Sequence, residues 1–171
     1  MEDGVLTRKG LKEGRSDIWT KEVYGDFILD LQFKVTAHTN SGIFIRTGNI
    51  IDPVQTGMEI QVADSNGAAE PGKHVCGAVY DCLAPDKNVV NPPDQWNRCT
   101  IACRANKIYV VMNGEPIIDM DLDRWTDPGR NPDGTKNKYK NPFKDMPRVG
   151  HFGFQDHGHP VWYRNIKVKP L

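Results

Sequence analysis

Alternation of apolar and polar residues between positions 27 and 36 is the feature that most constrains the fold of this chain. Phe27, Leu29, Leu31, Phe33 and Val35 are separated by single residues, most of them polar. Because side chains along a β-strand point alternately to its two faces, this period predicts a strand with one buried face. Such a face has to pack on a second layer, so a layered β-fold is expected.

Similar short segments recur along the chain, separated by turns that use many of its 16 glycines and 12 prolines. Asn113-Gly114 joins two apolar segments and predicts a hairpin, because both residues tolerate positive φ. No long helical period is present, which favours one all-β domain, a β-sandwich of two antiparallel sheets. The other predicted strands are residues 42–47, 57–63, 75–83, 97–103, 107–112, 116–121, 149–155 and 161–168.

Charge and hydropathy exclude several classes of partner. Lys plus Arg number 22 and Asp plus Glu number 22, so no net field attracts nucleic acid or an anionic membrane. No apolar run approaches the ~20 residues of a membrane span. Met1 is followed by Glu2-Asp3-Gly4, without the basic and apolar regions of a signal peptide. We therefore expect either a cytoplasmic protein or a trimmed exported one, and the opening, which reads as mid-domain, favours trimming.

The four cysteines leave two alternatives open. The spacing of Cys76, Cys82, Cys99 and Cys103 does not match paired CxxC zinc motifs. If their strands pair antiparallel, Cys82 could approach Cys99 while Cys76 approaches Cys103. The other alternative is four buried thiols that pack as small apolar residues.

The segment from Asp123 to Arg148 interrupts the strand pattern. It is rich in Pro, Gly, Asn and Lys, and it carries Trp125, Tyr139 and Phe143. A loop this long in a compact domain is often functional. Its aromatic rings suit stacking on a sugar, and they equally suit anchoring the loop to the body of the domain, which is the interpretation we favour.

Polar residues on the reverse faces of apolar strands indicate where a ligand would bind. Glu59 and Gln61 lie opposite the apolar face of one strand, Gln155 and His157 opposite that of another, and Arg46 beside a third. Amides, a carboxylate, an imidazole and a guanidinium in a concave site are the groups that bind sugar hydroxyls. The alternative is an ordinary solvated sheet face.

No motif points to a cofactor. The chain has no GxGxxG, P-loop, HExxH or GxSxG motif. His151, His157 and His159 suggest a metal site only if residues 157–159 are extended, and Gly158 with Pro160 favours a turn instead. We expect no cofactor and no resident metal, although these patterns leave a divalent metal possible.

Across most of its length the chain resembles the 3-keto-disaccharide hydrolase family. The matching segments are residues 19–21 (WTK), 24–27 (YGDF), 40–46 (NSGIFIR), 57–62 (GMEIQV), 77–80 (GAVY), 84–85 (AP), 96–97 (WN), 113–114 (NG), 153–158 (GFQDHG) and 161–166 (VWYRNI). The resemblance implies a concanavalin A-like jelly roll and a periplasmic or extracellular location. Family members usually begin further upstream than Glu2-Asp3-Gly4-Val5-Leu6, so we expect the N-terminal edge of the sandwich to be truncated.

By this resemblance the protein cleaves glycosides oxidised to a ketone at C3 of the sugar. Such chemistry needs a base for the C2 proton, donors for the enolate oxygen and an acid for the leaving group. Glu59 is the expected base, His157 the acid or second base, and Arg46 with Lys21 the enolate donors. The residues expected to hold sugar hydroxyls are Asn40, Gln61, Asp64 and Gln155.

Two other functions remain alternatives. A sandwich of this kind can be a non-catalytic carbohydrate-binding module, or a structural or partner-binding domain, because a fold alone does not fix a function. A binding module predicts affinity for unoxidised glycans without turnover. A partner-binding domain predicts an exposed apolar patch instead.

Overall fold

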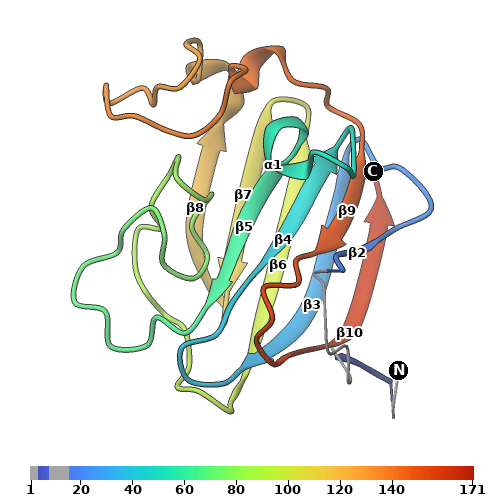
Figure 1. Cartoon of the computed structure of the whole chain (residues 1–171), viewed down its shortest axis with the longest axis vertical. Helices are drawn as coiled ribbons and strands as arrows, with labels where there is room; N and C mark the ends of the chain where they lie inside the picture. The colour runs from blue at the N-terminus through green and yellow to red at the C-terminus, as the bar shows by residue number, and fades with distance from the viewer. Residues whose placement is uncertain (1–3, 8–15) are drawn as a thin grey trace.

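A computed structural model describes residues 4–7 and 16–171 of the chain as a sandwich of two antiparallel sheets (Figure 1). The Met1–Asp3 part of the opening stretch lies outside the described residues. The elements are β1 (Val5–Thr7), β2 (Ile18–Trp19), β3 (Phe27–Val35), β4 (Asn40–Thr47), α1 (Pro53–Thr56), β5 (Met58–Ala63), β6 (Trp96–Arg104), β7 (Lys107–Met112), β8 (Glu115–Asp121), η1 (Leu122–Arg124), η2 (Phe143–Asp145), β9 (His151–Phe154) and β10 (Val161–Pro170).

The two sheets differ in size. The six-stranded sheet has the order β1-β10-β3-β6-β7-β8, and the four-stranded sheet has the order β2-β9-β4-β5. Because β3 and β10 lie in one sheet while β4 and β9 lie in the other, the chain crosses between the layers, as in a jelly roll. Within the described ranges, no helix is long and apolar enough to cross a membrane.

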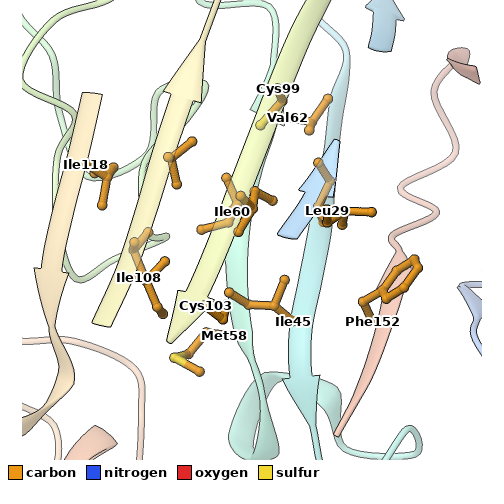
Figure 2. Close-up of a cluster of buried hydrophobic side chains, with 14 of the residues drawn as sticks. Leu29, Ile45, Met58, Ile60, Val62, Cys99, Cys103, Ile108, Ile118 and Phe152 are labelled. Carbon is orange, nitrogen blue, oxygen red and sulfur yellow. The ribbon is translucent and has the colours of Figure 1, made fainter. Parts of the chain in front are cut away.

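The alternation in β3 is confirmed. Its five apolar residues from Phe27 to Val35 are buried, and the residues between them are half-buried. Their side chains meet those of the four-stranded sheet, so that Leu29, Ile45, Ile60 and Phe152 contribute to one cluster between the layers (Figure 2). Apolar burial of this kind is the main favourable term that holds the two sheets together.

The predicted hairpin at Asn113-Gly114 is also confirmed. It joins β7 to β8, with φ of 52° at Asn113 and 88° at Gly114. Two consecutive residues with positive φ match the twist of the flanking strands, which explains the choice of these residue types.

The predicted strand over residues 75–83 is wrong. The segment forms only isolated bridges, because Gly77 and Asp81 take φ of 85° and 64° and break the extended backbone. It nevertheless runs beside β5, where the Gly77 N–H donates to the Gln61 carbonyl (2.8 Å) and the Tyr80 N–H donates to the Glu59 carbonyl (2.9 Å). The segment therefore covers the edge of β5 without being a regular strand.

The aromatic residues of the long loop anchor it to the body of the domain. Trp125, Tyr139 and Phe143 are buried and belong to the core cluster. The loop (orange in Figure 1) lies at the same end of the sandwich as α1. Anchoring is therefore the function of these rings, as the sequence favours.

The four cysteines are buried free thiols, which settles the alternative left open by the sequence. Cys99 and Cys103 lie on β6, Cys76 and Cys82 lie in the segment that covers β5, and all four belong to the core cluster. Burial raises the pKa of the Cys76 thiol to about 12 and that of Cys103 to about 12.

The native protein should therefore be inert to an aqueous thiol reagent near neutral pH. Burial blocks access, and the raised pKa values leave almost no thiolate to react. Titration with a chromogenic disulfide should detect no fast-reacting thiol in buffer and all four in denaturant. Rapid labelling of even one thiol in the native protein would contradict this packing.

Candidate functional site

The outward face of the four-stranded sheet carries the candidate site. Trp19, Gly153, Phe44 and Glu59 occupy one row across β2, β9, β4 and β5 in register. Although these side chains point away from the core, Phe44 is 1% exposed and Glu59 is 3% exposed. This face is therefore covered by other parts of the chain, unlike an ordinary solvated sheet face.

The neighbouring row places a glycine between two glutamines. Gly42 on β4 is paired with Gln61 on β5, and its carbonyl accepts from the Gln155 N–H at 2.9 Å just beyond β9. A Cβ at Gly42 would lie 2.5 Å from Glu59 Oε1, so the missing side chain gives the carboxylate its space. Glu59 thus leans from the edge strand over the middle of the sheet.

Trp19 reaches over the sheet in the same way from the opposite edge. A Cβ at Gly153 would lie 2.4 Å from the Trp19 ring, so the indole lies across this glycine. It stacks on Phe44 with 5.4 Å between ring centroids and 25° between ring planes. The two rings form an apolar platform on the outward face.

A cavity of about 390 Å³ opens beside this platform. Its polar wall includes Gln155, His157 and Asp17, and its apolar wall includes Ile51 from the loop before α1. Gln155 connects this cavity to Glu59, because its side chain also hydrogen-bonds the carboxyl group. A mixed polar and apolar lining of this size suits a small organic ligand.

Burial dominates the electrostatics of Glu59. Loss of solvent raises the pKa of its carboxyl group above the ordinary value of 4.5, and nearby Asp17 adds to the rise. Lys138 and the hydrogen bond from Gln155 act in the opposite direction without cancelling the effect. A carboxylate that is desolvated in this way is a stronger base than one in water.

The cation beside Glu59 comes from the long loop. Lys138 Nζ lies 3.6 Å from Glu59 Oε2 and 4.0 Å from the centroid of the Tyr80 ring. Its side chain is 32% exposed, so one side of the ammonium group meets solvent and the other meets the carboxylate. The site therefore contains a carboxylate and an ammonium group in contact on the outward face of the sheet.

Amide groups next to Glu59 present hydrogen-bond acceptors. Gln61 Nε2 donates to Asn40 Oδ1 at 2.9 Å, which fixes the orientation of the Gln61 amide. Within the described residues, the buried Oε1 atoms of Gln61 and Gln155 have no hydrogen-bond partner. Since a buried acceptor without a donor is unfavourable, both oxygens are suited to accept from ligand hydroxyls.

The histidines near the site do not form a metal cluster. Gly158 takes φ of 83° and turns the chain after His157, and His159 Nδ1 faces the Asn40 N–H at 3.4 Å. Among residues 4–7 and 16–171, no three His, Cys, Asp or Glu side chains are grouped as metal ligands. The predicted turn at Gly158 is confirmed.

Arg46 lies away from this group, contrary to its predicted position on the polar face. The register shifts between Phe44 and Thr47, and Arg46 takes φ of 49° at this bulge. Its fully buried guanidinium donates to the carbonyls of Gly25 (2.9 Å) and Ala105 (2.7 Å) and to Asp26 Oδ1 (3.0 Å). A bulge redirects a side chain that strict alternation would place outward.

Two other predicted site residues are also separate from the group. Lys21 is exposed in the bend two residues after Trp19, and it is not among the residues that line the cavity. Asp64 follows β5 and its Oδ2 accepts from the His38 N–H at 3.0 Å, which ties two turns together. The structure thus brings together Asn40, Glu59, Gln61, Gln155 and His157, and leaves out Lys21, Arg46 and Asp64.

Sequence reasoning missed three contributors to the site. Lys138 gives no periodic signal because it lies in an irregular loop, and Gly42 is informative only through the side chain it lacks. Trp19 lies on a strand of two residues, too short to show alternation. Its side chain was identifiable only as a large aromatic residue in a short polar segment.

The fold is shared with a class of carbohydrate-binding domains. A carbohydrate-binding module, CBM66, from Bacillus subtilis superposes with a TM-score of 0.55 over 97% of this chain and 95% of that one, at 10% identity. At that identity the likeness concerns the fold alone. The protein is thus a jelly-roll β-sandwich with a polar site on its outward face.

Residues 1–169 match the family described as 3-keto-alpha-glucoside-1,2-lyase-like domain, and the chain belongs to this carbohydrate-acting family. A relative from Bacteroides thetaiotaomicron, named 3-keto-disaccharide hydrolase, is 27% identical over 100% of this chain and 69% of its own length. A crystal structure from Parabacteroides distasonis, provisionally assigned as a glycosyl hydrolase, has a TM-score of 0.91 and 36% identity, covering 99% of this chain and 88% of that one.

Replacing Arg46 should destabilise the fold. Arg46→Met removes three hydrogen bonds and leaves the Gly25 and Ala105 carbonyls unpaired, so the free energy of unfolding should fall by about 3 kcal/mol. Urea denaturation measures this loss, and Arg104→Met, at an exposed end of β6, should change stability by less than about 0.5 kcal/mol. Equal stabilities for the two variants would contradict the structural role.

Replacing Glu59 by glutamine should have a pH-dependent effect on stability. Because the pKa of Glu59 is raised, the folded state disfavours the charged form, and this unfavourable term is present only above the ordinary pKa. Glu59→Gln should be at least as stable as the parent at pH 7, and the difference should shrink as the pH falls towards 4.5. Thermal denaturation across this range tests the sign; an advantage that grows on acidification would refute it.

Proposed function

We propose that this protein cleaves glycosides of 3-oxo sugars, with Glu59 as the base that removes the C2 proton. The observation that carries the proposal is the buried Glu59 carboxyl group, whose pKa is raised, beside Lys138 and linked through Gln155 to a ligand-sized cavity. Family membership and the name of the Bacteroides relative support the same substrate class.

The reaction follows from the ketone. A carbonyl at C3 acidifies the C2–H bond, so the base takes that proton and the electron pair forms an enolate. The pair then forms the C1–C2 double bond while the C1–O bond breaks, and the departing oxygen takes a proton from an acid. Addition of water across the resulting enone completes a net hydrolysis; without this addition the enzyme is a lyase.

The charges around Glu59 suit the first step. The desolvated carboxylate is the proton acceptor, and Lys138, rather than Arg46, is the cation near enough to stabilise the enolate oxygen. His157 lines the cavity and is our candidate for the acid that protonates the leaving oxygen. General acid–base steps of this kind contribute typically 10²–10⁴-fold to the rate.

The remaining residues suit recognition of a sugar. The Trp19 ring, which stacks on the buried Phe44, offers an apolar surface for one face of the sugar ring, and the Oε1 atoms of Gln61 and Gln155 accept from hydroxyls. Asn40 holds the Gln61 amide in orientation. A neutral, hydroxyl-rich ligand satisfies these acceptors, whereas an anionic group would face further oxygen atoms.

A non-catalytic binding module is the weaker alternative. The likeness to CBM66 concerns the fold alone, at 10% identity. Binding a neutral sugar does not require a buried carboxylate with a raised pKa, and such groups are typical of catalytic sites. The raised pKa of Glu59 therefore favours the enzyme.

The decisive experiment uses a 3-oxo-glucoside with a chromogenic aglycone. The protein should release the aglycone from this compound and not from the unoxidised glucoside. Deuterium at C2 should slow release, because the proposed base breaks that bond. Glu59→Gln should lower kcat on the order of 10²–10⁴-fold.

Glu115→Gln is the matched control, because Glu115 lies on β8 in the other sheet and pairs with Lys87. It should keep the parent rate. Saturable binding of unoxidised glycans without turnover of the 3-oxo-glycoside would contradict the enzymatic function and support a binding module. An unchanged rate in Glu59→Gln would remove Glu59 from its role.

A further inference from the structure

The backbone of the loop around Lys138 is held by the side chain of Gln55 on α1. Gln55 Nε2 donates to the Lys138 carbonyl at 3.1 Å, and the Lys140 N–H donates to Gln55 Oε1 at 2.8 Å. One amide therefore makes both hydrogen bonds that a neighbouring strand would make. Because α1 directly precedes β5, this contact joins the loop to the strand that carries Glu59.

Asp81 binds the backbone of Lys138 at its N–H group, on the other peptide that flanks this residue. The Lys138 N–H donates to Asp81 Oδ2 at 2.7 Å, and Asp81 itself lies next to Tyr80, whose ring contacts the Lys138 ammonium group. The Asp81 backbone is fixed too, since its carbonyl accepts from Asn131 Nδ2 at 3.0 Å and its N–H donates to the Lys73 carbonyl at 2.9 Å. The N–H and C=O of Lys138 are thus both bound by side chains from other segments.

Such clamping matters for lysine in particular. Its long, flexible side chain loses rotamer entropy when it is fixed, and Lys138 remains 32% exposed. The Nζ–Oε2 distance of 3.6 Å consequently depends on the position of the Lys138 backbone, from which the side chain extends. With the same rotamer, a shift of the backbone by about 1 Å away from Glu59 would carry the ammonium group beyond the separation of an ion pair.

We propose that Gln55 and Asp81 are positioning residues, which hold the Lys138 backbone so that its ammonium group stays on Glu59 and over the Tyr80 ring. The effect on catalysis rests on the function proposed above, whereas the effect on the charge state of Glu59 does not. Both side chains hydrogen-bond the backbone of Lys138, so their effect on the site passes through Lys138.

A purely structural role for Gln55 is distinguishable, because the loop has other anchors. Trp125, Tyr139 and Phe143 are buried in the core, and the Tyr139 hydroxyl donates to the Tyr80 carbonyl at 3.3 Å. Gln55→Leu should therefore leave the loop folded and release only the peptide at Lys138. The loss is local.

The test is a double-mutant cycle read out by NMR titration of the Glu59 side-chain carboxyl carbon. Lys138→Met should raise the pKa of Glu59, because the cation favours the charged form. Gln55→Leu alone should raise it in the same direction by part of that shift. In the Lys138→Met background, Gln55→Leu should add nothing, since its effect passes through Lys138.

Matched variants separate positioning from a loss of stability. Gln95→Leu removes an exposed glutamine before β6 and should leave the Glu59 titration unchanged. Asp81→Ala should raise the pKa of Glu59, because the acceptor for the Lys138 N–H is lost. Asp81→Asn keeps an acceptor and tolerates φ of 64°, so most of this rise should be absent. With a 3-oxo-glucoside, Gln55→Leu should lower kcat on the order of 10- to 100-fold, without a matching fall in thermal stability.

An unchanged Glu59 titration in Gln55→Leu, or additive shifts in the double variant, would overturn the proposal. Absence of turnover in the parent protein would instead overturn the proposed function, and the NMR cycle would still give its own answer. If the pKa of Glu59 in Asp81→Ala equals that of the parent protein, Asp81 has no positioning role.

Discussion

Removal of the Glu59 carboxylate from water is the constraint around which this site is organised. Strand β5 is buried on both faces, so a charged side chain on its outward face cannot reach bulk solvent. Burying an isolated carboxylate is strongly unfavourable unless a cation or hydrogen-bond donors stabilise it. Lys138 and Gln155 provide that stabilisation only in part, and the carboxyl group keeps a raised pKa. Partial stabilisation leaves a group that can still take up a proton.

The irregular segments supply the cation and the cover of the site, which the regular strands do not provide. β5 and β9 fix the positions of Glu59 and Gln155 through the backbone ladder, whereas the cation comes from the long loop and the cover of the β5 edge from residues 75–83. The loop is itself irregular, yet its buried rings and side-chain hydrogen bonds fix it locally. Precision at the site therefore depends on tertiary contacts of single residues as much as on the sheets.

Much of the fold follows from short-range pattern. Alternation identified β3, and Asn113-Gly114 identified the β7–β8 hairpin, because both signals are local consequences of backbone geometry. The same rule placed Glu59, Gln61 and Gln155 on one face. It failed at Arg46, where a bulge redirects the side chain, and over residues 75–83, where positive φ at Gly77 and Asp81 interrupts the strand. Lys138 lay beyond prediction because its approach to Glu59 depends on contacts distant in sequence.

The two glycines on the outward face give the central strands a particular part in the design. At Gly42 and Gly153 the inner strands have no side chain, and the edge strands extend Glu59 and Trp19 into that space. The Glu59 carboxyl group and the Trp19 ring therefore extend from the edge strands over these two glycines. Any side chain at Gly42 or Gly153 would clash with Glu59 or Trp19, whereas the edge strands and loops carry no such restriction. Divergence of substrate choice among proteins built this way should therefore be concentrated at the periphery.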